Sequence, residues 1–189
     1  MLKKIEKGNY GYMSSNQKRN LVLTAICAVI TVLLMGIGYA LWHVKLNLLM
    51  VPAMLCVIPT ANYLVAYLAV CMFSSADPER YEQVKAFDEA GMLVSDLVIV
   101  DEKGGRNGME FAVIYKNGVV GFQGTKKNSK DMLEITVNDT LKKKSLPMRL
   151  KVYRDWNEFI KRISDLEAPD EEAKKRVELA REAMLSVSM

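Results

Sequence analysis

The chain has 189 residues, of which half are hydrophobic and a quarter are charged. The charge is uneven: residues 1–20 hold five basic residues against one acid, residues 21–73 hold only Lys45, and residues 74–189 hold 20 basic against 21 acidic residues. The basic excess therefore flanks an apolar region, where Lys and Arg mark the cytoplasmic side of a membrane span. This explains the net charge of +4 without a nucleic acid, which is not an expected partner.

Two long apolar segments follow the basic arm of residues 1–20. Residues 21–42 are uncharged and, at about 1.5 Å per residue, long enough to cross a hydrocarbon core of about 30 Å. Residues 48–73 are longer and need to tilt or kink. Because residues 43–47 alone join them, we predict a transmembrane hairpin over 21–73. The basic arm predicts that both termini are cytoplasmic, at the plasma membrane. A cleaved signal peptide is the alternative for the first segment, but its uncharged run exceeds the usual length.

The second apolar segment keeps Pro59 and Asn62 in its interior. Pro59 should kink a helix, and an amide in lipid needs a hydrogen-bond partner. One interpretation is a kink packed against the first helix, through the small residues Gly36 and Ala40. The other is a polar seam that binds a partner subunit or a small ligand. We favour the first interpretation, because two spans are too few to enclose a substrate path.

Residues 76–166 alternate between helical and strand patterns and predict a cytoplasmic α+β domain with a mixed sheet. An Asn-Gly pair at 117–118 indicates a hairpin, and Ser129 and Asp155 are predicted helix caps. Residues 167–189, starting near Pro169, predict a C-terminal helix. The expected order is αβββαβα: a helix over 78–90, strands over 93–100, 109–115 and 119–123, a helix over 129–144, a strand over 148–153 and a helix over 156–166.

Residues with recognised chemistry are few. The three cysteines, Cys27, Cys56 and Cys71, all lie in the apolar segments, and His43 is the only histidine. The sequence shows no phosphate-binding glycine loop and no zinc spacing. We therefore predict no catalytic residue, no metal site and no cofactor.

The order αβββαβ resembles the core of restriction-endonuclease-like nucleases. In that family a helix carries Glu, a strand carries Asp and the next strand carries Glu-x-Lys, which together bind a divalent metal. The resemblance places Glu82, Asp96 and Lys116 in those positions, but Ile114 stands where the second Glu belongs. The resemblance therefore implies an inactive nuclease-like domain, because a hard cation needs that carboxylate.

The whole organisation resembles bacterial two-span membrane proteins that carry a small cytoplasmic α+β domain. That resemblance supplies no catalytic residues. We expect a membrane-anchored, cytoplasm-facing binding or assembly protein, with a protein partner or a second copy of itself. The alternatives are a membrane-tethered nuclease-like domain and a small subunit of a transporter complex.

Overall fold

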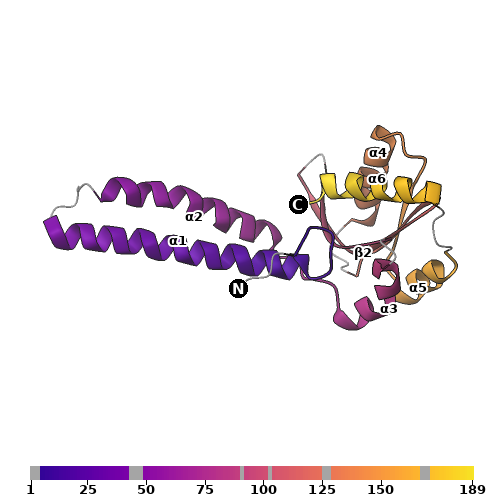
Figure 1. Cartoon of the computed structure of the whole chain (residues 1–189), viewed down its shortest axis with the longest axis horizontal. Helices are drawn as coiled ribbons and strands as arrows, with labels where there is room; N and C mark the ends of the chain where they lie inside the picture. The colour runs from indigo at the N-terminus through magenta and orange to yellow at the C-terminus, as the bar shows by residue number, and fades with distance from the viewer. Residues whose placement is uncertain (1–4, 43–48, 90–91, 102–103, 125–128, 167–170) are drawn as a thin grey trace. The chain divides into compact units, whose positions relative to one another are not determined.

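A computed structural model describes residues 5–42, 49–89, 92–101, 104–124, 129–166 and 171–189 (Figure 1). The predicted link at 43–47 and the predicted helix start at Pro169 lie outside these residues. The chain divides into two compact units. Ser14–Met72 belongs to one unit, and Ile5–Met13 joins Phe73–Met189 in the other. Part of the predicted basic arm thus groups with the α+β region.

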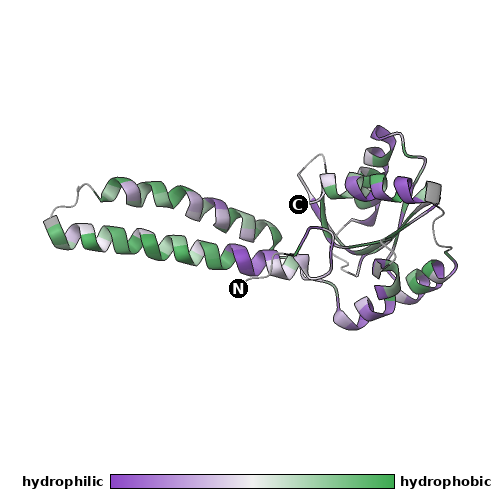
Figure 2. Cartoon of the chain, in the orientation of Figure 1, coloured by the Kyte–Doolittle hydropathy of each residue, from purple (hydrophilic) through white to green (hydrophobic). Residues whose placement is uncertain are grey.

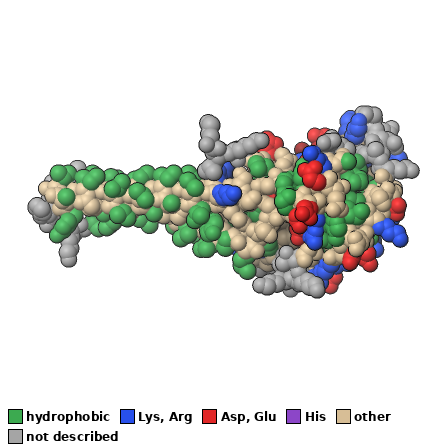
Figure 3. All heavy atoms as spheres, turned by 90° about the horizontal axis from the view of Figure 1, so that it is seen from below, with side chains coloured by type: hydrophobic (Ala, Val, Ile, Leu, Met, Phe, Trp, Pro, Cys, Tyr) green, Lys and Arg blue, Asp and Glu red, His purple; other side chains and the backbone are tan. Residues whose placement is uncertain are grey.

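The first unit contains two long apolar helices, α1 (Tyr12–Trp42) and α2 (Met50–Val70). Both are long and apolar enough to cross a membrane. Hydrophobic residues occupy most of their length and cover their outer surface (Figures 2 and 3). Helix α1 begins nine residues before the predicted span, so it carries the polar residues 14–20 as its first turns.

The two helices run side by side (Figure 1), and each has one less exposed face. On each face the residues recur at alternating spacings of three and four, the packing pattern of left-handed helix pairs. Gln17 also donates a hydrogen bond to the carbonyl of Val70, at 2.6 Å. Gly36 and Ala40 are exposed, so the prediction that they pack against the second helix is wrong. The buried glycine of α1 is Gly38. The two faces consist of Asn20, Thr24, Cys27, Thr31, Leu34 and Gly38 on α1, and Ala53, Cys56, Thr60, Tyr63, Tyr67 and Val70 on α2.

The second unit is built on a four-stranded mixed sheet, which confirms the predicted sheet type. The strand order is β1-β2-β3-β4, with β1/β2 and β2/β3 antiparallel and β3/β4 parallel. The Asn-Gly signal marks the β2–β3 hairpin, in which Tyr115 pairs with Gly118. The strands are β1 (Leu93–Val100), β2 (Arg106–Tyr115), β3 (Gly118–Phe122) and β4 (Leu150–Tyr153). Strand β2 starts three residues earlier than predicted, because residues 106–108 pair with the end of β1.

Helices cover both faces of this sheet (Figure 1). Helices α4 (Lys130–Lys143) and α6 (Glu171–Val187) share one hydrophobic core with the sheet, through residues such as Leu133, Val137 and Met184. Helices α3 (Pro78–Glu89) and α5 (Trp156–Ser164) share a second core, through Val84 and Phe159. The C-terminal helix is thus one layer of the domain, not an appendage.

The predicted caps explain where two of these helices begin. The Ser129 hydroxyl accepts from the amide of Met132, and the Asp155 carboxylate accepts from the amides of Asn157 and Glu158. Such side chains satisfy amides that have no partner within the helix.

Both edges of the sheet are closed by other parts of the domain. On β1, the amide of Ser95 donates to the carbonyl of Gly8, and the amide of Met189 donates to the carbonyl of Val98, both near 2.9 Å. On β4, side chains of α4 take the place of a neighbouring strand. Asn138 exchanges two hydrogen bonds with the backbone of Leu150, and Glu134 accepts from the amide of Val152. Exposed strand edges invite pairing with other chains, and these contacts cover part of both edges.

We predict that a chain in which residues 14–72 are replaced by a short Gly/Ser linker folds cooperatively. Met13 and Ala76 donate to one carboxylate, that of Asp96, so a short linker can join the two ends. Residues 73–189 alone lose the 5–13 segment and several hydrogen bonds, which should lower the unfolding free energy by roughly 3 kcal/mol. Thermal denaturation followed by circular dichroism compares the two chains. Equal melting midpoints would show that residues 5–13 add nothing to the domain.

Candidate functional site

Asp96 occupies an unusual position in β1. Its φ angle is +54°, in the left-handed region that few non-glycine residues adopt, and its side chain is 4% exposed. The ladder between β1 and β2 skips Asp96 and the residue opposite it, Glu110. Val94 and Leu97 both face the α4/α6 core, although residues three apart in a regular strand face opposite sides. The side-chain alternation of β1 therefore shifts by one residue at Asp96. A buried acid at a strained backbone position is a candidate functional residue, and its contacts decide its role.

The Asp96 carboxylate binds backbone amides from two distant segments. One oxygen, Oδ2, accepts from the amides of Gly11 at 2.9 Å and Met13 at 3.4 Å. The other, Oδ1, accepts from the amide of Ala76 at 2.9 Å, and Ser75 adds a side-chain hydrogen bond. Along the chain, these donors lie immediately before and after the apolar hairpin. We call this group of contacts the Asp96 clamp.

Burial raises the pKa of Asp96 above its ordinary value, because removal from water penalises the charged form. The hydrogen bonds from Ala76, Ser75, Met13 and Gly11 oppose that shift, because each one favours the carboxylate. The charge of Asp96 is therefore engaged by donors of its own chain. A carboxylate used in this way holds backbone in place.

The segment Ile5–Met13 is fixed along its length. Lys7 donates to the carbonyls of Leu185 and Ser188 at the C-terminal end of α6. The helix dipole favours a positive charge at this end. The ring of Tyr10 stacks on that of Tyr81 at 4.0 Å between centroids.

Gly8 marks the closest approach of this segment to the domain. It adopts φ +89°, and a Cβ there would lie 2.8 Å from Leu185 and 3.1 Å from Val94. Only glycine fits both the angle and the space. The segment is thus part of the domain's packed structure.

Glu110, the acid opposite Asp96, was not predicted as a site residue. Its Oε1 accepts from the amide of Gly124 at 3.2 Å, and its Oε2 lies 3.5 Å from Nη1 of Arg80. Burial raises the pKa of Glu110; the charge of Asp96 adds to that rise, whereas Arg80 and Gly124 lower it. In the sequence, Glu110 stands out as the single acid in the predicted strand 109–115, whose other residues are apolar. Only the strand pairing shows that Glu110 lies opposite Asp96.

Arg80 connects this acid to an aromatic cluster. Its guanidinium lies 5.2 Å from the ring centroid of Phe122 and 5.4 Å from that of Trp156. Trp156 also packs edge-on against Phe122 and donates from Nε1 to Gln83 at 3.1 Å. Helix α5 therefore packs on β3 and α3 through its aromatic residues, and Arg80 lies between an acid and two rings.

The structure does not gather the nuclease-like positions into one site. Glu82 lies on α3 with its side chain 67% exposed and 3.5 Å from Lys85. Lys116 lies in the β2–β3 turn, six residues beyond Glu110 and hence roughly 20 Å along the strand from the level of Asp96. Ile114 is fully buried in the α4/α6 core. Within the described residues, no three His, Cys, Asp or Glu side chains lie close enough to hold a metal ion.

Pro59 and Asn62, the two positions singled out in the second apolar segment, differ in their surroundings. Pro59 is half-buried, and α2 remains a single helix through it. The neighbouring Thr60 donates its hydroxyl to the carbonyl of Cys56 at 2.7 Å. Asn62 lies on the outer surface of α2 and is exposed. In the described part of the chain its amide has no hydrogen-bond partner.

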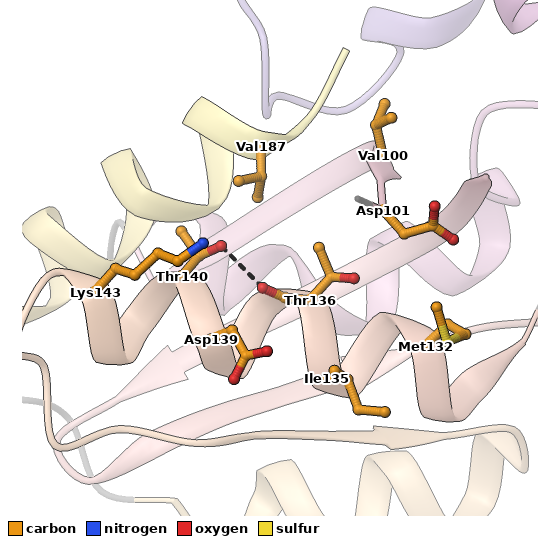
Figure 4. Close-up of a pocket in the computed structure, with 9 residues that line it drawn as sticks. All are labelled: Val100, Asp101, Met132, Ile135, Thr136, Asp139, Thr140, Lys143 and Val187. Carbon is orange, nitrogen blue, oxygen red and sulfur yellow. Dashed lines mark hydrogen bonds between the residues drawn. The ribbon is translucent and has the colours of Figure 1, made fainter. Parts of the chain in front are cut away.

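One cavity of about 250 Å³ lies between α4, the end of β1 and α6 (Figure 4). This volume is below that of most small-molecule sites. Several polar groups in its wall are already engaged: Thr140 donates to the carbonyl of Thr136, Asp101 accepts from Gly105, and Asp139 pairs with Lys142. Ile135 is 53% exposed and also lines the cavity. The cavity presents no arrangement of reactive groups.

Comparison of the chain with family models, with curated proteins and with solved structures finds no match.

We predict that Asp96→Ala lowers the unfolding free energy of the full chain in detergent by about 3 kcal/mol or more. It leaves three backbone amides without an acceptor. It also keeps a residue with a Cβ atom at a positive φ angle, without the hydrogen bonds that stabilise Asp96 there. Asp96→Asn should cost less, because asparagine tolerates this φ and keeps one acceptor oxygen. Glu82→Ala, at an exposed position, should change stability by less than about 0.5 kcal/mol. Thermal melts test the order; equal effects at positions 96 and 82 would contradict the clamp.

We predict that Glu110→Gln flattens the pH dependence of stability. Because the folded chain raises the pKa of Glu110 above its ordinary 4.5, the unfolded chain loses this proton first as the pH rises. Stability is therefore lost from about pH 4.5 upward, through the raised pKa of the folded state. Glutamine removes that contribution and still accepts from Gly124, while Asp96 keeps its own share. Denaturant titrations between pH 4 and 7 measure the slope, and an unchanged slope in the variant would refute this assignment.

Proposed function

We propose that this protein is a two-span membrane protein that holds a cytoplasm-facing α+β domain at the membrane for binding or assembly with a protein partner. One observation carries the anchor: α1 and α2 expose large apolar side chains over their outer surface, with Val32 68% and Leu41 64% exposed. Burying one such side chain is worth about 1.5–3 kcal/mol, so a surface of this extent requires lipid or another apolar partner.

The Asp96 clamp supports the role of the domain. A flexible linker would let a tethered domain move freely, whereas here the segments that lead into and out of the hairpin are both hydrogen-bonded to the domain. The domain therefore organises both of the segments that connect it to the apolar helices. The closed sheet edges favour recognition through helical surfaces over the addition of a strand.

The geometry gives less support to the nuclease-like alternative. Asp96, the acid that this reading needs, is occupied by three backbone amides, and the other two positions lie elsewhere on the domain. We therefore assign Asp96 a positioning role. The transporter-subunit alternative needs contacts between the hairpin and other chains, and the exposed Asn62 on α2 is a residue that can make such a contact.

We predict that the protein resists alkaline carbonate extraction and that both termini are cytoplasmic. In a bacterial host, a fluorescent-protein fusion at Met189 should be bright, and an alkaline phosphatase fusion there should be inactive. Replacing Lys18 and Arg19 by Gln while adding two lysines to the 43–47 link should weaken this orientation, because the basic bias is removed. Lys7 is left intact, since it binds the end of α6. An active phosphatase at Met189 in the unaltered chain would overturn the orientation, and release by carbonate would overturn the anchor.

A further inference from the structure

The outer surface of α2 carries a regular seam. Its residues lie at spacings of four, three, four and three, which place them along one face of the helix, as residues at the contact of two packed helices are. The four apolar members have 60–63% of their surface exposed, and the fifth member, Asn62, is also exposed. The seam consists of Val51, Leu55, Ile58, Asn62 and Val65.

Asn62 stands apart from the other polar groups of the hairpin. Thr24, Thr31 and Thr60 each donate a hydroxyl to the carbonyl four residues earlier, at 2.7–2.9 Å, so these groups are satisfied within their own helix. The Asn62 amide, a donor and an acceptor, lacks such a partner among the described residues. In a hydrocarbon environment an unpaired amide is costly, and neighbouring helices commonly supply the bond.

We propose that two copies of this chain pair through the α2 seam, with the Asn62 amides hydrogen-bonded to each other across a twofold axis. This inference rests on the proposed membrane insertion. Both copies then enter the bilayer in one orientation, so a twofold axis along the membrane normal places each seam residue opposite its own equivalent. An amide offers both a donor and an acceptor, so Asn62 is complementary to itself.

The apolar seam residues supply the packing, and the asparagine supplies the register. A single asparagine at an inward heptad position fixes alignment and oligomeric state in coiled coils. Between helices in lipid, van der Waals packing and interhelical hydrogen bonds drive association. The sequence alone favoured a shaping role for Pro59 and Asn62. The exposed position of Asn62 shifts this interpretation, because a residue that only shaped the hairpin would point toward α1.

The test is disulfide crosslinking of the full-length protein in membranes. The three native cysteines are replaced by alanine, and one cysteine is introduced in the seam, Ile58→Cys. The matched control is Val32→Cys, an equally exposed apolar position on α1. A copper–phenanthroline oxidant removes the two thiol hydrogens and joins the sulfurs. Carbonate extraction of every variant reports insertion separately.

The expected result is a covalent dimer of twice the chain mass for Ile58→Cys and a monomer for Val32→Cys. Adding Asn62→Leu should raise the dissociation constant about 3- to 20-fold, which is the range for one hydrogen bond between membrane helices, whereas Asn62→Gln should keep the dimer. Thr60→Val, which removes a hydroxyl bonded inside its own helix, should have no effect. An inserted protein that stays monomeric, a crosslink to a different protein, or a dimer unaffected by Asn62→Leu would overturn the pairing. A protein that is not inserted would overturn the membrane anchor together with the pairing.

Discussion

The buried carboxylate of Asp96 is the interaction on which the organisation of this protein depends. A charge away from water is tolerated only when several donors satisfy it, and here the donors come from Gly11, Met13, Ser75 and Ala76. Those donors lie more than sixty residues apart along the chain, on either side of the hairpin. One side chain therefore brings together the two places where the chain passes between its apolar helices and its α+β domain.

The same residue also reshapes the strand that carries it. The positive φ of Asp96 interrupts the ladder with β2 and shifts the side-chain alternation, so that Val94 and Leu97 lie on the same face. The register of the two strands puts Asp96, which is buried, and Glu110, which is half-buried, at one level of the sheet. Strain of this kind persists only when surrounding contacts fix it, and the clamp and the Arg80 ion pair provide them.

Other segments of the domain cover part of both edges of the sheet. Residues 5–13 and the C-terminus complete β1, while Glu134 and Asn138 complete β4. In the hairpin, the threonine hydroxyls on the inner face form hydrogen bonds within their own helices, whereas Asn62 faces outward.

The sequence by itself determined the features that follow from local patterns. Long uncharged runs predicted two apolar helices, alternating residues predicted strands, Asn117-Gly118 predicted the hairpin turn, and Ser129 and Asp155 predicted helix starts. These signals act over a few residues, because period, turn chemistry and capping are properties of neighbours in the chain. The sequence also singled out Asp96 and Asn62, but the surroundings of both residues depend on the tertiary structure: Asp96 binds backbone amides, and Asn62 is exposed on α2.

Only the tertiary structure decided which distant groups meet. Some of these contacts join residues up to 181 positions apart in the chain. They pair Asp96 with the amides of residues 11, 13 and 76, Glu110 with Arg80, and Lys7 with the end of α6. No local pattern encodes such contacts, since they depend on strand order and on the layer that each helix occupies. The burial of Gly38 in place of Gly36 and Ala40 has the same cause: which face of an apolar helix turns inward is set by its neighbour, because all its faces are similarly hydrophobic.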